Sequence, residues 1–229
     1  MTFLVLANFK SHKLETEVTT WLTAVAPALA QSPRLKLLVA PSLLHLPASH
    51  TYLSTHPIPI DLVAQDVSPF PPGAYTGAIN ASQLKEYGVT YSLVGHSERR
   101  RYFHETHQDV ANKVNELLSC GITPAICLSR EDIVPQFAAL SDDQQNKCIY
   151  CFEPPADIGG TTTAPLDVIK DTVAQIKNYT TAPVLYGGSV TPENVASLLT
   201  LPIDGVLVAT ASLDASSLTA IISTCSHAR

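Results

Sequence analysis

Residues 205–209, which read GVLVA, are apolar at consecutive positions, and so are LVLA at 4–7 and LLVA at 37–40. A strand with one face in solvent alternates apolar and polar residues. A strand of a parallel sheet that helices cover on both faces is apolar throughout. These runs therefore predict a parallel sheet that lies between helices.

Eight β-rich runs alternate with helical stretches along the 229 residues. The expected strands are residues 3–8, 36–41, 60–65, 90–95, 123–128, 148–153, 183–188 and 205–209. Eight βα units in a chain of this length predict an α/β fold, a (β/α)8 barrel that forms a single domain over residues 1–229. An open doubly wound sheet uses the same units, but no G-x-G-x-x-G motif follows the first run. Pro27 is expected to end or bend the first helix.

The composition excludes several classes of protein. Hydrophobic residues make up 45% of the chain and charged residues 15%, a balance that provides a large core and excludes intrinsic disorder. The net charge of −6 gives no basic field for nucleic acid or an anionic membrane surface. No apolar run approaches the ~18 residues of a membrane span, and the first residues lack the basic region of a signal peptide. We therefore expect a soluble, cytoplasmic protein that binds neither nucleic acid nor membranes.

The five cysteines do not form a disulfide scaffold, because an odd number in a long chain leaves at least one unpaired. Cys148 and Cys151 form a C-x-x-C motif, which is typical of redox pairs and half zinc sites. They fall within an expected strand, however, where residues three apart point to opposite faces. No second C-x-x-C exists. We therefore predict buried free thiols and no metal site.

Polar residues follow the expected strands at their carboxyl ends, the edge that carries the active site of a barrel. Asn8 and Lys10 follow the first strand, His96 and Glu98 the fourth, and Glu153 ends the sixth. Each residue alone is also compatible with a solvated loop or a helix cap. Their placement at one edge together favours a common site.

Two glycine-containing loops are candidates for anion binding. Gly187-Gly188-Ser189 leads into Thr191-Pro192, which is typical of a helix start, and glycines let backbone amides approach an anion there. Residues 158–163, IGGTTT, are small and rich in hydroxyl groups, as in a loop that closes over a ligand. An ordinary βα turn and an ordinary surface loop remain the alternatives.

Five segments together resemble triosephosphate isomerase: NFK at 8–10, VGHSERRRYF at 94–103, FEPPADIGG at 152–160, YGGSV at 186–190 and GVLVATASL at 205–213. They occur in that family's order and extend over most of the chain. The resemblance implies a (β/α)8 TIM barrel that interconverts dihydroxyacetone phosphate and D-glyceraldehyde 3-phosphate through an enediolate. It also implies that no metal or organic cofactor is required, and that the enzyme is a homodimer, with a dimer of dimers as the alternative.

The resemblance also assigns roles to residues. It implies that Glu153 is the catalytic base, that His96 is a neutral electrophile, and that Lys10 and Asn8 bind substrate, with Glu98 as the ion-pair partner of Lys10. Residues 154–163 match a lid that covers the enediolate. Positions that match phosphate-binding or supporting residues of the family are Gly159, Gly188, Ser189, Ala209, Thr210, Thr76 and Cys127.

The chain departs from the family pattern at several positions. The lid reads PPADIGGTT where AIGTGK and an aromatic hinge are common, and Ala209-Thr210 replaces a common Gly-Gly. Ala78 replaces a common Glu, so we expect an ion pair to Arg99 to be lost. The interval from Cys127 to Glu153 is short, which predicts a truncated fifth helical segment.

Two other functions remain open on the sequence alone. The altered lid and phosphate loops are compatible with a barrel that binds phosphosugars without turnover. A ribulose-phosphate epimerase is the third possibility, although no cluster of metal-binding carboxylates and histidines follows the strands.

The loop 66–76 contains SPFPPGAYT and is long and apolar, which indicates a functional segment. By resemblance it projects into a partner subunit, where Thr76 approaches the partner's active site. The alternative is that its prolines fold the loop back onto its own barrel.

Overall fold

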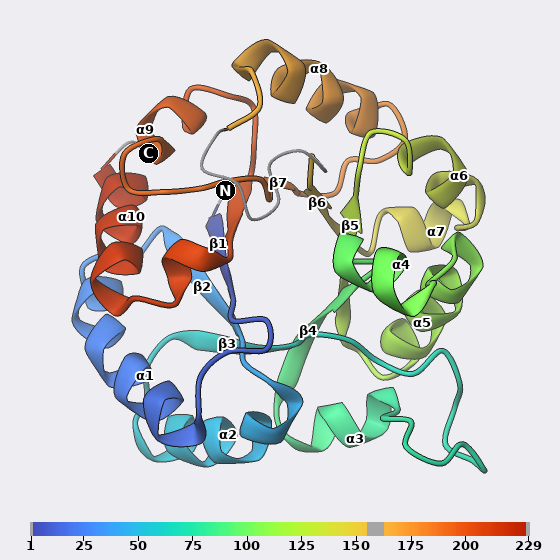
Figure 1. The fold of residues 1–229 in the computed structure, drawn as a ribbon, viewed down its shortest axis with the longest axis horizontal. Helices are drawn as coiled ribbons and strands as arrows, with labels where there is room; N and C mark the ends of the chain where they lie inside the picture. The colour runs from blue at the N-terminus through green and yellow to red at the C-terminus, as the bar shows by residue number, and fades with distance from the viewer. Residues whose placement is uncertain (1, 155–162, 228–229) are drawn as a thin grey trace.

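The computed structural model describes residues 2–154 and 163–227, and in it eight parallel strands form a closed barrel (Figure 1). Each strand pairs with its neighbours in sequence, and β1 pairs with β8 to close the barrel. The strands are β1 (Phe3–Asn8), β2 (Leu35–Ala40), β3 (Ile60–Ala64), β4 (Val89–Val94), β5 (Thr123–Leu128), β6 (Ile149–Phe152), β7 (Val184–Tyr186) and β8 (Gly205–Val208). The prediction of a (β/α)8 TIM barrel is confirmed, and the open sheet is excluded.

Helices form a ring outside the barrel (Figure 1). They are α1 (Glu15–Ala30), α2 (Leu46–Thr55), α3 (Ala81–Glu86), α4 (Ser97–Phe103), α5 (His107–Ser119), α6 (Ile133–Ala138), α7 (Asp142–Gln145), α8 (Leu166–Lys177), α9 (Val195–Leu198) and α10 (Ala215–His227), with 3-10 turns η1 (Leu43–His45) and η2 (Thr210–Ser212). Between β5 and β6 stand only α6, of 6 residues, and α7, of 4. The truncation of the fifth helical segment is therefore confirmed.

Of the two expectations for Pro27, that it ends or bends the first helix, the first is wrong, because the helix continues to Ala30. Proline lacks the N–H that would bond to the carbonyl four residues earlier, and this loss falls near the end of the helix. Val25 and Leu29, on either side of the proline, are both buried in the core. Their packing holds the last turn in helical form.

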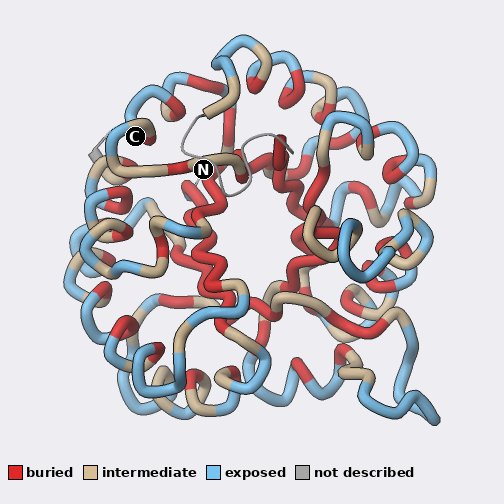
Figure 2. The backbone as a smooth tube through the Cα atoms, viewed as in Figure 1, coloured by how far each residue is buried: buried red, intermediate tan, exposed pale blue. Residues whose placement is uncertain are grey.

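The core has two layers, because successive strand residues point to opposite faces. Leu4 and Leu6 fill the inside of the barrel, whereas Val5 and Ala7 pack outward against the helices. Figure 2 shows the barrel strands as mostly buried and the surrounding helices as buried on one side. Full burial of each Leu or Val side chain contributes about 1.5–3 kcal/mol. The apolar runs of the sequence therefore supply both layers.

The cysteines follow the same division. Cys148 packs in the layer between barrel and helices and Cys151 lies inside the barrel, so the two thiols of the C-x-x-C motif are on opposite faces. All five cysteines are free thiols. Burial raises the pKa of Cys148 to about 12. The prediction of buried thiols is confirmed for this motif.

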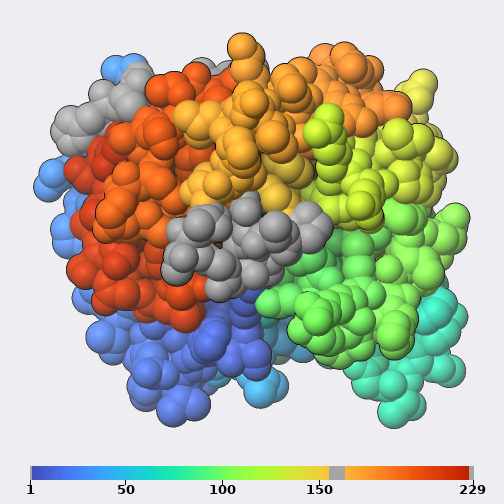
Figure 3. Space-filling view, turned by 45° about the horizontal axis from the view of Figure 1, so that its top comes forward, coloured from blue at the N-terminus to red at the C-terminus, as the bar shows by residue number. Residues whose placement is uncertain are grey.

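The loop 66–76 extends away from the barrel, at the lower right of Figure 1 and along the teal edge of Figure 3. Its tip is exposed, and the rings of Phe70 and Tyr75 stack on each other with centroids 4.5 Å apart. The alternative in which the prolines fold the loop back onto its own barrel is therefore wrong.

Arg99 has carboxylate partners although Ala78 offers none. Its guanidinium lies 2.7 Å from Asp66 Oδ2 and 3.1 Å from Glu105 Oε1. Glu105 and Asp66 also pair with the buried Lys113 of α5. Arg99 is thus fixed by residues that flank β3 and α4, without a carboxylate at position 78.

In the part of the chain that the structure describes, no helix combines the length and the apolar character needed to cross a bilayer.

Candidate active site

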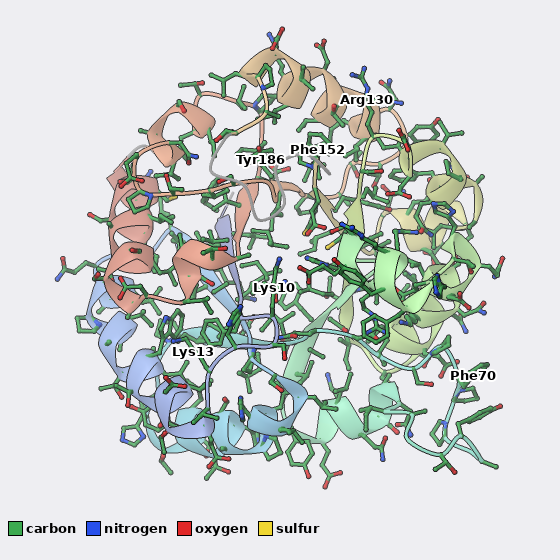
Figure 4. All side chains as sticks on the ribbon, viewed as in Figure 1. Lys10, Lys13, Phe70, Arg130, Phe152 and Tyr186 are labelled. Atoms are coloured by element: carbon green, nitrogen blue, oxygen red, sulfur yellow. The ribbon has the colours of Figure 1, made fainter. Side chains whose placement is uncertain are left out.

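A cavity of about 710 Å³ opens at the carboxyl ends of the strands. It is lined by seven of the residues to which the resemblance assigned roles: Lys10, His96, Glu153, Gly188, Ser189, Ala209 and Thr210. They come from the ends of β1, β4, β6, β7 and β8, which the closed barrel brings to one rim. Figure 4 shows Lys10 near the centre of this rim, with Phe152 and Tyr186 on its far side.

The backbone of Lys10 has a φ of 49°, in the left-handed region that non-glycine residues rarely adopt. Two side chains hold it there: Asn8 Oδ1 accepts the Lys10 N–H at 3.0 Å, and Gln65 Nε2 donates to the Lys10 carbonyl at 2.8 Å. Lys10 Nζ lies 2.7 Å from Glu98 Oε1, so the expected ion pair is present. Asn8 is buried, and its side chain acts on the site by holding the backbone of Lys10.

His96 caps the N-terminus of α4 with its side chain. Its Nδ1 accepts a hydrogen bond from the backbone N–H of Glu98 at 3.2 Å. Because a backbone N–H only donates, Nδ1 is the acceptor in this hydrogen bond. Nε2 lies 3.4 Å from Glu153 Oε1. The cap therefore holds the imidazole ring beside the carboxylate at the cavity, without a hydrogen bond between Nε2 and Oε1.

Glu153 is almost fully buried, with a side-chain exposure of 2%. Its backbone N–H donates to the Leu128 carbonyl at 2.8 Å, which extends the β5–β6 pairing by one residue. Oε2 receives one long contact of 3.5 Å from the N–H of Ser97, and Oε1 has no hydrogen-bond partner among the described residues. A buried carboxylate oxygen without a donor is costly for folding, and such exceptions are typical of catalytic positions.

Gly187 provides the space that the Glu153 side chain occupies. A Cβ added at Gly187 would lie 3.0 Å from Glu153 Cγ, 3.4 Å from the Phe152 carbonyl oxygen and 3.5 Å from Leu207 Cβ. The first glycine of YGGSV thus allows close packing of β7 against the carboxylate. The sequence predicted that this glycine lets backbone amides approach an anion, with an ordinary βα turn as the alternative, and gave no sign of its packing against Glu153.

Cys127 lies inside the barrel on β5, beside Cys151 on β6 in the strand register. Burial raises the pKa of the Cys127 thiol, and the nearby Cys151 and Glu153 raise it further. Cys127 is therefore a protonated thiol that packs behind the carboxylate and does not line the cavity.

The two predicted phosphate loops face the cavity from β7 and β8. Gly188 and Ser189 follow β7, and Ala209 and Thr210 lead into η2. Thr76 lies on the exposed loop 66–76 and does not line this cavity. Gly159 and most of the segment 154–163 lie outside the described residues. Within residues 2–154 and 163–227, no group of three or more His, Cys, Asp or Glu side chains is arranged to hold a metal ion.

Several residues of the site carried no clear signal in the sequence. Gln65 follows β3 at the same rim and could have been found by its position there. Asn194 also lines the cavity, and its Nδ2 donates at 2.7 Å to Oγ1 of Thr163, the last residue of the predicted ligand-covering loop 158–163. Their contact joins segments 31 residues apart, which no local pattern shows.

The family model described as triosephosphate isomerase matches residues 3–225. The chain is similar to the triosephosphate isomerase of Lactobacillus gasseri, with 39% identity over 176 residues that cover 66% of this chain and 70% of that protein. It is 34% identical to the enzyme so named in Polynucleobacter asymbioticus, over 92% of this chain and 94% of the other. It is also 34% identical to the triosephosphate isomerase of Thermus thermophilus, over 96% of this chain and 97% of that protein.

Proposed function

Because this chain belongs to the triosephosphate isomerase family, we propose that it interconverts dihydroxyacetone phosphate and D-glyceraldehyde 3-phosphate by proton transfer through an enediolate. The observation that carries the proposal is the pair formed by Glu153 and His96. Glu153 Oε1 is buried and has no hydrogen-bond partner among the described residues, and it lies 3.4 Å from His96 Nε2; both residues line the same cavity as Lys10.

The first step is removal of a proton from carbon. The Glu153 carboxylate takes the proton from the carbon next to the substrate carbonyl, and the C–H electron pair forms the enediolate double bond. As this double bond forms, the carbonyl π electron pair moves onto its oxygen. The carboxylic acid then returns the proton to the former carbonyl carbon, which takes it up with the C=C electron pair. The hydroxyl proton of the other oxygen passes to the former carbonyl oxygen, and the O–H electron pair left behind forms the new C=O bond, which completes the isomerisation. The Glu153 side chain is only 2% exposed, so this proton transfer takes place largely out of contact with bulk water.

The second requirement is stabilisation of charge on the two substrate oxygens. His96 Nε2–H donates to these oxygens, while the cap on Nδ1 holds the ring in place. Lys10 supplies a positive charge fixed by Glu98 and by its own constrained backbone. Donors that are already oriented need no rearrangement as charge develops, which is the main source of such stabilisation.

A coupled assay with purified protein and dihydroxyacetone phosphate tests the activity. Glu153→Gln keeps the size of the side chain and removes the base, so it should lose nearly all turnover while still binding a phosphoglycolate inhibitor. If the wild-type protein binds phosphosugars but does not turn them over, the alternative function, a phosphosugar-binding barrel without catalysis, is correct. The presence of all four rim groups, Asn8, Lys10, His96 and Glu153, favours catalysis over that alternative.

We further propose that the enzyme is a cytoplasmic homodimer. All five thiols are free, as reducing compartments maintain them. The exposed, stacked Phe70 and Tyr75 form an apolar tip on a loop that projects from the barrel, and the exposed Leu43 lies beside the base of the same loop. Such a tip is suited to a two-fold interface in which each loop contacts the other subunit. Mass measurement at micromolar concentration distinguishes a dimer or tetramer from a monomer.

A further inference from the structure

We propose that Asn194 is a positioning residue for the phosphate-binding loop after β7, and that it acts by fixing the Ser189 peptide. This inference rests on the proposed function, because it concerns how the phosphate of the substrate is held. Asn194 lies just before α9 and lines the same cavity as Lys10 and Glu153.

The side chain of Asn194 makes three hydrogen bonds to other segments. Nδ2 donates to the Ser189 carbonyl at 2.7 Å and to Thr163 Oγ1 at 2.7 Å, and Oδ1 accepts the N–H of Thr191 at 2.9 Å. An Asn at this position usually caps its own helix, yet here it makes no such bond to α9. The side chain is therefore used to join neighbouring segments.

The Ser189 carbonyl is the centre of the cluster. It accepts from both Asn194 Nδ2 and Thr163 Oγ1, the latter at 3.1 Å, which uses both lone pairs of the oxygen. A peptide unit is planar, so holding this carbonyl also sets the direction of the Val190 N–H that follows it. Without the amide, the peptide after Ser189 could rotate and the loop would lose its shape at the cavity wall.

A second anchor extends the cluster to the barrel. The N–H of Ala164, next to Thr163, donates to the hydroxyl of Tyr186 at 3.4 Å. Tyr186 is the last residue of β7, fully buried, and lies at the rim in Figure 4. Thr163 and Ala164 are therefore held at both sides, by the barrel strand and by Asn194. The loop that contains Ser189 is therefore bonded to a segment, Thr163-Ala164, that is itself held in place.

The test compares substrates with and without phosphate. Asn194→Ala should lower kcat/KM for glyceraldehyde 3-phosphate at least about tenfold, equivalent to about 1.4 kcal/mol, and weaken phosphoglycolate binding by a similar factor. Turnover of glyceraldehyde, which has no phosphate, should change less than about twofold. Asn112→Ala, at an exposed site of α5, is the matched control and should change neither.

A second variant separates the contacts of the amide. Asn194→Asp keeps the acceptor for Thr191 and loses the donor to Ser189, so it should be as defective as Asn194→Ala toward the phosphorylated substrate. Full activity of either variant would overturn the inference, and so would equal losses with both substrates, which indicate a general structural role. If the wild-type protein fails to isomerise glyceraldehyde 3-phosphate, the proposed function itself is wrong.

Discussion

Gly187→Ala adds one methyl group beside the Glu153 carboxylate, the proposed base, and tests how closely the fold positions it. The new Cβ would lie 3.0 Å from Glu153 Cγ, whereas ordinary carbon contacts are about 3.5–4.0 Å. Glu153 must then move by roughly half an ångström, because the Phe152 carbonyl and Leu207 limit movement of the methyl group on its other sides.

The size of the effect follows from this displacement. A misplacement of about 1 Å at a reacting group can cost ~100-fold in rate, so half of that should cost about tenfold in kcat, or about 1.4 kcal/mol of transition-state stabilisation. Overpacking should also lower the free energy of unfolding by about 1–3 kcal/mol. Binding of a phosphoglycolate inhibitor should change little, because the phosphate loops keep their contacts.

The assay is steady-state turnover in both directions, together with urea unfolding and inhibitor titration on the same preparation. Glu153→Asp is a useful comparison, because it retracts the carboxylate by one methylene and should also reduce kcat more than binding. A Gly187→Ala protein that folds and keeps its full kcat would refute the reasoning. In that case the carboxylate tolerates displacement, or it is not the base.

Three further predictions concern charge and assembly. Lys10→Met should slow turnover by at least about 100-fold and weaken phosphoglycolate binding, measured by calorimetry; unchanged affinity would place Lys10 outside the site. Burial raises the pKa of Glu105, but Lys113 and Arg99 lower it by more, so its pKa in the folded protein lies below the usual value. The ionised carboxylate therefore stabilises the folded state above about pH 4.5, and this stabilisation is lost as the pH falls through the folded-state pKa. Glu105→Gln should therefore cost about 3–5 kcal/mol at pH 7 in urea unfolding at fixed protein concentration, with a smaller difference below pH 4; an equal difference at both pH values would contradict this. Thr76→Arg should give monomers with little activity by mass measurement and assay, and fully active monomers would show that the loop does not complete its neighbour's site.

Much of the fold could be predicted from the sequence because barrel strands carry a local signal. Residues 3–8 and 123–128 were expected as strands and form β1 and β5 with the same bounds. Other strands differ at their ends, as in β7, where the strand is Val184–Tyr186 instead of the expected 183–188. The N–H of Gly187 still donates to the Phe152 carbonyl at 2.8 Å, and the chain turns into the loop at the cavity after it.

Only those residues of the site that directly follow a strand could be predicted from the sequence. Glu153 and His96 could be placed at one rim because each follows an apolar run. The contacts of Gln65 with Lys10, and of Gly187 with Glu153, depend on how strands far apart in sequence are tilted and aligned. Such contacts leave no pattern within one segment of the sequence. The ion pair of Arg99 with Asp66, which takes the place of a pair with a carboxylate at position 78, is unpredictable for the same reason.

The left-handed backbone of Lys10 makes this position a point of conflict between folding and catalysis. A non-glycine residue with positive φ costs about 1–2 kcal/mol, and glycine would adopt the same conformation without that cost. If variants of this chain were screened for heat resistance alone, glycine at position 10 would be enriched, although it removes the positive charge at the rim. A heat-resistant variant that keeps lysine at position 10 would then indicate that the selection had acted on activity as well as on stability.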